Sequence, residues 1–166
     1  MATPTAEVAL NIVDVHPDNH DLFESFLSIT EEHYTESWPE EVCQNKWREH
    51  YSRTVTERMK TDVRRWLWLV EFEGKVVGLA NFYLTGPQDQ RIGTIQELYI
   101  RPAYRGRRIG YALFAKVKEE LVKSDAKRIK ASVAVDELGS MKFFENYGFR
   151  LERVNLVLNT DPEGEL

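Results

Sequence analysis

Two strand-like runs in the middle of the chain are separated by only two residues. Trp66–Phe72 and Lys75–Leu84 flank Glu73-Gly74, a pair that favours a tight hairpin turn. Such a short connection forces the two strands to be antiparallel, because a parallel pair needs a crossover of a dozen or more residues. A doubly wound, all-parallel sheet is therefore excluded for this part of the chain.

The rest of the chain alternates strand-like and helical patterns. Further strands are predicted at Val8–Val15, Ile92–Ile100, Ile129–Val135 and Phe149–Leu158. Helices are predicted from Pro17 to about His33, from an N-cap at Ser37 with Glu40 in a capping box to near Thr61, over Gly110–Val122, and over Leu138–Tyr147 with Gly148 as its stop. Hairpins mixed with crossover helices predict a mixed α/β fold, with a predominantly antiparallel sheet flanked by helices.

Length and composition indicate one globular domain. The 166 residues match one ordinary domain, expected over 1–166 with a frayed tail from about residue 159. Hydrophobic residues make up 42% and charged residues 30%, which excludes a disordered or collagen-like chain. No run approaches the ~18 apolar residues of a membrane span. We expect a cytoplasmic protein, because no Lys or Arg precedes Lys46 and the only cysteine, Cys43, permits no internal disulfide.

Charge is distributed unevenly along the sequence. Residues 101–130 hold ten basic and three acidic side chains, a net charge of +7 that leaves −12 for the rest of a chain whose total is −5. Residues 31–41 contain five glutamates and no Lys or Arg. Either the first segment binds an anion and the second a cation, or both are solvated helix faces.

The most informative stretch is QELYIRPAYRGRRIGYAL, Gln96–Leu113. A strand, a turn rich in Arg and Gly, and a helix follow one another, so the first helical N–H groups are available to an anion. Glycines allow the backbone to approach phosphate closely, and the guanidinium groups of Arg105, Arg107 and Arg108 supply further hydrogen-bond donors. The stretch therefore predicts a polyphosphate site, although neither the P-loop pattern nor G-x-G-x-x-G is present.

These residues resemble a known family. The segment Arg105–Gly110, RGRRIG, is similar to the acetyl-CoA signature Q/R-x-x-G-x-G/A of the GNAT superfamily of N-acetyltransferases. The preceding QELYIRPAYRG resembles the strand of that family, and KFFENYGF, Lys142–Phe149, resembles its F-Y-x-x-x-G-F. The resemblance covers about residues 96–150, and it implies the GNAT acyl-CoA N-acyltransferase fold with acetyl-CoA as co-substrate.

The resemblance also implies roles for particular residues. Backbone groups of Leu98, Tyr99 and Ile100 are expected to bind the pantetheine arm, and an N–H near Leu98 to polarise the acetyl carbonyl. The pyrophosphate is expected on the backbone N–H groups of Arg105, Gly106, Arg107, Arg108, Ile109, Gly110 and Tyr111. Phe144 is placed with these cofactor-binding residues. The amine attacks the thioester directly, so Cys43 is expected to be structural.

The sequence departs from the family pattern at several positions. The first glycine of the signature is Arg108 here, which we expect to adopt a negative φ with its side chain pointing outward. The general-acid tyrosine of the family falls on Phe144, and an asparagine seven residues earlier falls on Glu137. Tyr147 is a stand-in candidate for the acid, as are Tyr99 and Tyr83.

The acceptor side needs a base and an amine site. Glu97 lies beside the thioester in the resemblance and is the candidate base; the alternative is a solvent-facing strand carboxylate paired with an Arg. Glu31, Tyr34 and Trp38 are candidates for binding a cationic amine, since carboxylates and aromatic faces suit such a group. The alternative for this acidic segment is a solvated loop.

Other candidate sites are weaker. No His spacing suggests zinc, so no metal is expected, and Trp66 and Trp68 share a strand face as core residues. We therefore interpret the chain as an N-acetyltransferase for a primary amine of small-molecule or peptide origin. The sequence indicates no membrane or nucleic-acid partner and leaves a homodimer open. A non-catalytic acyl-CoA-binding module, and after it a nucleic-acid-binding protein using residues 101–130, are the alternatives.

Overall fold

The computed structural model describes residues 8–43, 46–134 and 136–156. These belong to two compact units, Met1–Ser132 and Val133–Leu166, which are treated separately below. The described strands of the first unit are β1 (Asn11–Asp14), β2 (Arg64–Phe72), β3 (Lys75–Thr85), β4 (Ile92–Ile100) and β5 (Arg128–Ala131). Its helices are α1 (His20–Ser37), α2 (Pro39–Cys43), α3 (Trp47–Thr61), the short 3₁₀ helix η1 (Pro102–Tyr104) and α4 (Ile109–Lys123). The second unit contains α5 (Leu138–Asn146).

The strands form one sheet in the order β1-β2-β3-β4-β5. Neighbours from β1 to β4 are antiparallel, and β5 runs parallel to β4 after the crossover helix α4. The β2–β3 hairpin turns at Glu73-Gly74, where both residues have positive φ (50° and 75°), as a type I′ turn requires. The predicted mixed, mostly antiparallel fold is therefore confirmed.

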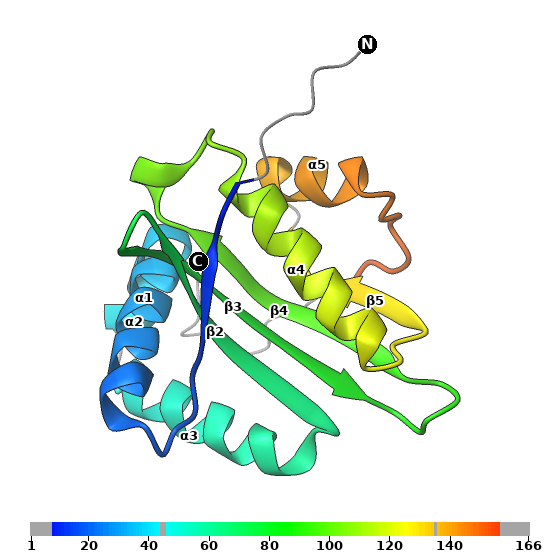
Figure 1. The fold of residues 1–166 in the computed structure, drawn as a ribbon, viewed down its shortest axis with the longest axis horizontal. Helices are drawn as coiled ribbons and strands as arrows, with labels where there is room; N and C mark the ends of the chain where they lie inside the picture. The colour runs from blue at the N-terminus through cyan, green and yellow to red at the C-terminus, as the bar shows by residue number, and fades with distance from the viewer. Residues whose placement is uncertain (1–7, 44–45, 135, 157–166) are drawn as a thin grey trace. The chain divides into compact units, whose positions relative to one another are not determined.

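Helices cover both faces of the sheet (Figure 1). On one face α4 buries Leu113, Val117 and Leu121 near the stacked rings of Trp66 and Phe82, whose centroids are 4.9 Å apart. On the other face, α1 and α3 pack against the sheet in a core cluster of Val15, Phe23, Phe26, Leu27, Ile29, Tyr51, Val55, Leu67, Leu69, Leu79 and Tyr99. The placement of Trp66 and Trp68 in the core is confirmed, since both are buried.

The helices of the N-terminal half differ from the sequence expectations. The first helix begins at His20 rather than Pro17, because the Asn19 side chain accepts the Leu22 N–H and caps it. It runs on through Ser37, so Ser37 is not an N-cap. The single helix expected up to Thr61 is divided into α2 and α3, since Lys46 adopts a left-handed conformation (φ 62°) that a helix cannot contain.

Three predicted strands are shorter or missing. The first begins at Asn11, and β5 ends at Ala131, where its pairing with β4 also ends. Residues 149–156 form no strand. Residues 157–158 of that predicted strand, and the frayed tail predicted from about residue 159, lie outside the described residues.

Candidate active site

A β-bulge interrupts the middle of β4. Asn81 of β3 pairs with Glu97, but the next β3 residue, Phe82, pairs with Ile95, so Gln96 is an extra residue on β4. Before the bulge β4 directs Gly93 toward α4, where an added Cβ would meet Leu121 Cδ2 at 2.7 Å. After the bulge, Glu97 contacts α1 and α3 instead. The extra residue thus turns Glu97 to the face opposite the one that simple alternation assigns to it.

Glu97 is a buried carboxylate surrounded by donors. The residue is only 3% exposed. Oε1 accepts the Tyr34 hydroxyl at 2.8 Å and Gln96 Nε2 at 3.1 Å, and Oε2 accepts the Tyr51 hydroxyl at 3.0 Å. The solvent-facing position considered from the sequence is therefore wrong, because the bulge turns this side chain into the protein.

Burial raises the pKa of Glu97, while hydrogen bonds from Tyr34, Tyr51 and the side-chain amides of Asn81 and Gln96 act in the opposite direction. The same carboxylate, together with burial, raises the pKa of Tyr51 well above its ordinary value, so this hydroxyl stays protonated and keeps donating. Burial thus moves the pKa of Glu97 upward, in the direction of neutral pH, where a general base is most effective.

Aromatic rings from three segments gather around this carboxylate. The Tyr34 ring lies 5.0 Å from that of Trp47, 5.5 Å from Trp38 and 5.9 Å from Tyr51, while His33 is 4.8 Å from Tyr99. We call His33, Tyr34, Trp38, Trp47, Tyr51 and Tyr99 the aromatic cluster. Tyr51 and Tyr99 are buried and the other four are half-buried, so the cluster extends from Glu97 outward. Ring faces in such a setting can bind an amine cation.

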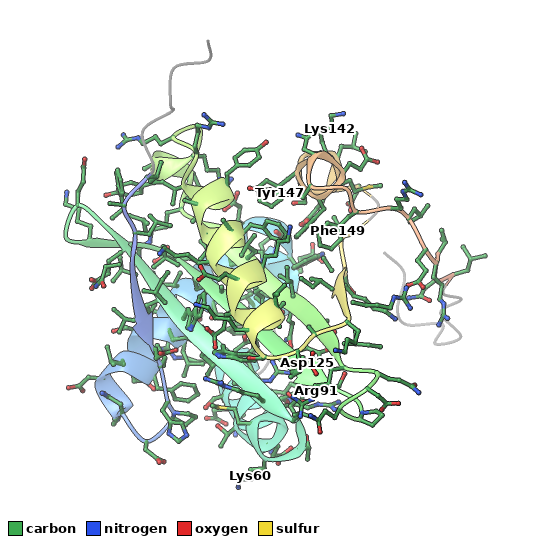
Figure 2. All side chains as sticks on the ribbon, turned by 45° about the vertical axis from the view of Figure 1, so that its right-hand side comes forward. Lys60, Arg91, Asp125, Lys142, Tyr147 and Phe149 are labelled. Carbon is green, nitrogen blue, oxygen red and sulfur yellow. The ribbon has the colours of Figure 1, made fainter. Side chains whose placement is uncertain are left out.

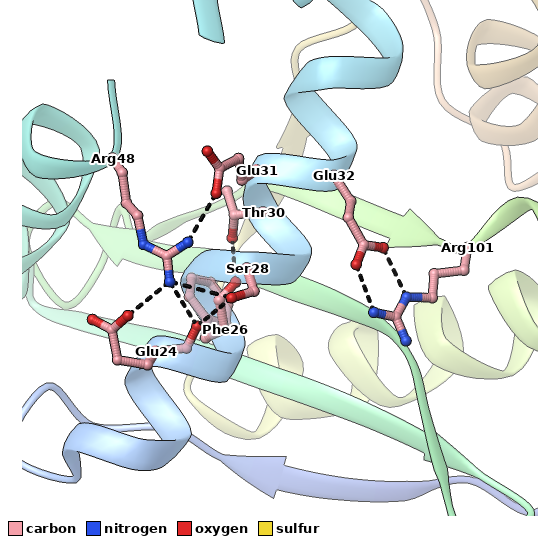
Figure 3. A network of polar contacts seen from close by, with 8 residues as sticks. All are labelled: Glu24, Phe26, Ser28, Thr30, Glu31, Glu32, Arg48 and Arg101. Carbon is pink, nitrogen blue, oxygen red and sulfur yellow. Dashed lines mark hydrogen bonds and ion pairs between the residues drawn. The ribbon is translucent and has the colours of Figure 1, made fainter. Parts of the chain in front are cut away.

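The structure brings only part of the predicted acceptor site together. Tyr34 and Trp38 contact each other, and Tyr34 binds Glu97. Glu31 instead pairs with Arg48 of α3 at 2.8 Å, and the same guanidinium binds Glu24 at 2.7 Å (Figure 3). Glu31 is thus part of a link between α1 and α3, separate from the aromatic cluster.

Two further glutamates of α1 are paired across to the segment that follows β4. Glu32 binds Arg101 through two hydrogen bonds of 2.6 and 2.8 Å (Figure 3), and Glu36 binds Arg105 through two of 2.6 and 2.9 Å. The Arg105 hydrogen bonds hold the pKa of Glu36 below its usual range against the effect of partial burial. Burial and Glu36 together raise the pKa of Tyr99 to about 12.

These ion pairs change how the acidic segment of residues 31–41 is interpreted. A shallow groove along α1 is lined by Ser28, Glu31, Glu32, Thr35, Glu36 and Pro102, and each of its three carboxylates has an arginine partner. The negative charge that the sequence offered to a cationic acceptor is therefore largely compensated here. Glu97 differs from these carboxylates, because its partners are hydroxyl and amide donors rather than a cation.

The turn between β4 and α4 has the shape expected of an anion site. Gly106 has φ +76° with open space around an added Cβ, so glycine serves the backbone conformation there. Arg108, the residue before α4, has φ +61°, which corrects the negative φ expected from the sequence; it enters the helix from the left-handed region, with an exposed side chain. The first N–H groups of α4 have no acceptor within the helix and lie at its positive end.

Arg105 differs from the other predicted phosphate-binding residues. Its backbone N–H donates to Pro102 O at 3.2 Å, its Nε donates to Ile100 O at 2.9 Å, and its remaining guanidinium nitrogens bind Glu36. Arg105 therefore joins α1 to the turn, and the backbone donors of the turn begin at Gly106.

The edge of β4 that faces β5 is only partly paired. Within the described residues β5 pairs with Ile92–Ile95, the part of β4 before the bulge. The predicted pantetheine-binding residues Leu98, Tyr99 and Ile100 follow the bulge and pair with β3 alone. An extended ligand could use the unpaired backbone groups of this edge.

The second unit carries the remaining candidates. Phe144 lies within α5, and Tyr147 follows it at the C-terminal cap, with Gly148 (φ +85°) ending the helix as expected. The Phe143 and Tyr147 rings are 5.4 Å apart, and those of Phe144 and Phe149 are 5.0 Å apart (Tyr147 and Phe149 are labelled in Figure 2). The roles given to Phe144 and Tyr147 stay predictions.

Sequence reasoning missed three residues of the Glu97 site. The sequence pattern assigns no site role to Tyr51, Asn81 or Gln96. The adjacent polar pair Gln96-Glu97 inside an apolar strand was the available signal of a bulge. In the described ranges, no cluster of three or more metal-ligating side chains occurs. No helix among them is long and apolar enough to span a membrane.

Comparison with known proteins adds independent information. The model of the acetyltransferase (GNAT) family matches residues 19–149. An uncharacterized N-acetyltransferase of Methanocaldococcus jannaschii is 26% identical over 112 residues, which cover 66% of this chain and 48% of that protein. The chain thus spans about half the length of this curated relative.

Solved structures share the fold. An aminoglycoside acetyltransferase from an uncultured soil metagenomic sample is 22% identical with a TM-score of 0.67, over 92% of this chain and 99% of the other. A predicted acetyltransferase with acetyl-CoA from Clostridium acetobutylicum is 17% identical with a TM-score of 0.71, over 91% of this chain and 96% of the other. At these identities the likeness establishes a common fold.

Proposed function

This chain belongs to the acetyltransferase (GNAT) family, and from that premise we propose that it is an acetyl-CoA-dependent N-acetyltransferase that acetylates a primary amine by direct attack on the thioester. The observation that carries the proposal is the buried Glu97 carboxylate at the β4 bulge, next to the strand edge that β5 leaves unpaired. A base and an edge for an extended ligand thus lie at one point of the sheet.

Acetyl-CoA binds along β4 and at the start of α4 in this proposal. The pantetheine arm lies beside Leu98–Ile100, whose backbone groups on that edge have no strand partner among the described residues. The pyrophosphate lies on the N–H groups of Gly106–Tyr111, which the positive φ of Gly106 and Arg108 directs around the helix N-terminus. A backbone N–H near Leu98 polarises the acetyl carbonyl.

Glu97 removes the proton that keeps the acceptor amine unreactive. An alkylammonium has no lone pair, so one proton must leave before attack. Glu97 itself is buried, whereas Tyr34, which donates to it, is half-buried and belongs to the aromatic cluster. The proton therefore passes through the Tyr34 hydroxyl: Tyr34 gives its proton to Glu97 and takes one from the amine.

Acetyl transfer then proceeds without a covalent enzyme intermediate. The amine nitrogen forms the C–N bond to the thioester carbonyl carbon, and the C–S bond breaks. CoA leaves as a thiolate, which takes the second proton of the attacking nitrogen and becomes the free thiol. This step requires no general acid on the protein, which suits a chain with Phe144 in place of the usual tyrosine.

The acceptor is a primary amine that is positively charged in solution. Glu97 supplies the negative charge, and the aromatic cluster supplies ring faces against which an ammonium and its carbon frame can pack. An amine that carries a flat or apolar body fits this surrounding better than a polyhydroxylated one, because most of the cluster surface is aromatic carbon.

Release of free CoA thiol tests this function. Purified protein is incubated with acetyl-CoA and a panel that contains an arylalkylamine, a polyamine, an aminoglycoside, an amino acid and a peptide with a free N-terminus. We expect amine-dependent thiol release, fastest with the arylalkylamine. Acetyl-CoA binding without thiol release for any amine would contradict the proposal and favour a non-catalytic acyl-CoA-binding module.

A further inference from the structure

A second set of polar side chains continues from Glu97 into the sheet. Arg65 of β2 and Asp62, which precedes that strand, form an ion pair of 2.8 Å with side chains only 3% and 6% exposed. Arg65 Nη1 also donates to Asn81 Oδ1 at 2.7 Å and to Gln96 Oε1 at 2.8 Å. Both amides lead onward to the Glu97 site, Asn81 through Tyr51 at 3.1 Å and Gln96 directly at 3.1 Å.

The hydrogen bonds of this network all run in one direction. A guanidinium only donates, so both amide oxygens face Arg65. Their NH₂ groups therefore point the other way, toward Tyr51 and toward Glu97. Because Tyr51 accepts from Asn81, its own hydroxyl hydrogen is left for Glu97. Reversing either amide would place its NH₂ group against the Arg65 guanidinium and its oxygen toward Tyr51 or Glu97, which removes a donor from the carboxylate side.

Stability alone does not account for this arrangement. A buried ion pair is often no more stabilising than apolar side chains of the same volume, because both charges lose their hydration. The Arg65 guanidinium also lies over the Tyr83 ring, 4.3 Å from its centroid. Apart from the Asp62 pair, its polar contacts are to the two amides that lead to the Glu97 site.

We propose that Arg65, anchored by Asp62, is a positioning residue for acetyl transfer, which fixes Asn81 and Gln96 in the orientation that keeps donors on Glu97. This inference rests on the proposed role of Glu97 as the base. Without Arg65 the amides are free to reverse, Glu97 loses donors that favour its ionised form, and the carboxylate holds its proton to higher pH.

Other titratable groups around Glu97 have to be separated in the test. Tyr34 of α1 and Tyr51 of α3 face it directly, and Arg65 with Asp62 lies behind the two amides. His33 packs on Tyr34 at 5.3 Å, and an ordinary imidazole titrates at roughly pH 6.5. The pH dependence of kcat/KM is therefore also recorded for each variant in a His33→Gln background.

The test compares Arg65→Met with Arg64→Met. Arg64 is the neighbouring arginine on β2, more than half exposed, and it pairs with Glu120 on the α4 side. We expect Arg65→Met to lower kcat/KM for the amine roughly 10–100-fold near neutral pH. The acid limb of the plot of kcat/KM against pH should move to higher pH, and KM for acetyl-CoA should stay unchanged. Arg64→Met should match the unmodified protein in all three measurements.

Gln96→Met supplies an independent variant, because Gln96 is exposed at the bulge and its substitution should leave the fold intact. It breaks the link between Arg65 and Glu97 and should move the acid limb in the same direction. An unshifted acid limb in Gln96→Met, or in folded Arg65→Met, overturns the positioning role. Full activity of Glu97→Gln would instead overturn the base itself, so the two failures are distinguishable.

A double variant completes the test. If Arg65 acts through Glu97, adding Arg65→Met to Glu97→Gln should cost less than threefold further in kcat/KM. Losses that multiply fully in the double variant would show that Arg65 acts by another route and would contradict the proposal.

Discussion

Glu97 combines burial with several hydrogen-bond donors. Burial raises its pKa, which makes it a better proton acceptor near neutrality, and three donors within 3.1 Å keep the ionised form attainable. The two tyrosines that serve it are not equivalent. Tyr34 is a half-buried member of the aromatic cluster, whereas Tyr51 is a buried one.

The tyrosines therefore separate proton transfer from simple hydrogen bonding. Both Tyr34→Phe and Tyr51→Phe remove one donor from Glu97, but only Tyr34→Phe interrupts the proposed proton path. We expect Tyr34→Phe to lower kcat roughly 100-fold and Tyr51→Phe to lower it less than tenfold. Steady-state kinetics with the best amine measures both. Equal losses in the two variants would contradict a relay through Tyr34.

At this scale the sequence pointed to Glu97 as a candidate base but not to the residues that surround it. Glu97 was identified through its place in a family-like strand, and Tyr34 and Trp38 through the aromatic residues of an acidic segment. Tyr51 and Asn81 could not be found, because a buried tyrosine on a helix and a buried asparagine on a strand look the same as core positions until the helix is packed on the sheet. Arg108 was misjudged for a related reason: its φ depends on how the turn enters α4.

At the scale of elements, the bulge in β4 has two consequences. It turns Glu97 toward α1 and α3, and it marks the point where pairing with β5 ends. Strand alternation read from the sequence treats Ile95 and Glu97 as neighbours on one face, which a single extra residue reverses. The break between α2 and α3 was unpredictable for a similar reason, since the left-handed conformation of Lys46 is decided by tertiary structure.

The start of α4 provides a prediction about the co-substrate. Gly110 lies in the first turn of α4, where the proposed pyrophosphate meets backbone N–H groups. Gly110→Asp places a carboxylate beside that anion and should weaken acetyl-CoA binding at least tenfold, measured by calorimetry. Gly139→Ala, in α5, should leave the affinity unchanged. Unaltered affinity in a folded Gly110→Asp variant would contradict the placement of the pyrophosphate.

Close packing of β3 against β4 gives a prediction about stability. A Cβ added at Gly78 would lie 2.1 Å from the Tyr99 carbonyl oxygen, a backbone atom that cannot move away without disturbing β4. Gly78→Ala should lower the free energy of unfolding by about 1–3 kcal/mol. Gly139→Ala, where a Cβ has open space in a helix, should raise it by about 0.5–1 kcal/mol. Urea unfolding measures both, and an unchanged stability for Gly78→Ala would show that β3 and β4 separate easily.

At the scale of the whole first unit, α1 is tied to its surroundings by ion pairs on two sides. Arg48 links it to α3, while Arg101 and Arg105 link it to the segment after β4. Composition correctly showed an acidic and a basic segment, but it could not show that they would pair with each other in the fold. Two of the ten basic residues of 101–130 thus pair with the acidic segment.

These pairs predict a dependence of stability on pH. The pKa of Glu36 is lower in the folded protein than in the unfolded chain, so its pair stabilises the fold above the unfolded pKa and loses that contribution as the pH falls through the folded value. Glu36→Gln should lower the free energy of unfolding by about 0.2–1 kcal/mol at neutral pH and by less in acid. Thermal unfolding across pH measures this. Glu119→Gln, at a fully exposed pair with Lys123, is the control with a smaller effect, and a pH-independent difference for Glu36→Gln would contradict the account.

The central claim is that Glu97 accepts the proton of the amine, and the pH dependence of kcat/KM in Glu97→Gln tests it most directly. We expect the variant to lose 10²–10⁴-fold in kcat/KM for the amine while acetyl-CoA affinity, measured by calorimetry, stays the same. The acid limb that belongs to Glu97 should vanish, leaving only the ionisation of the amine. Full activity across the whole profile would contradict the account and would make Glu97 a structural residue of the sheet.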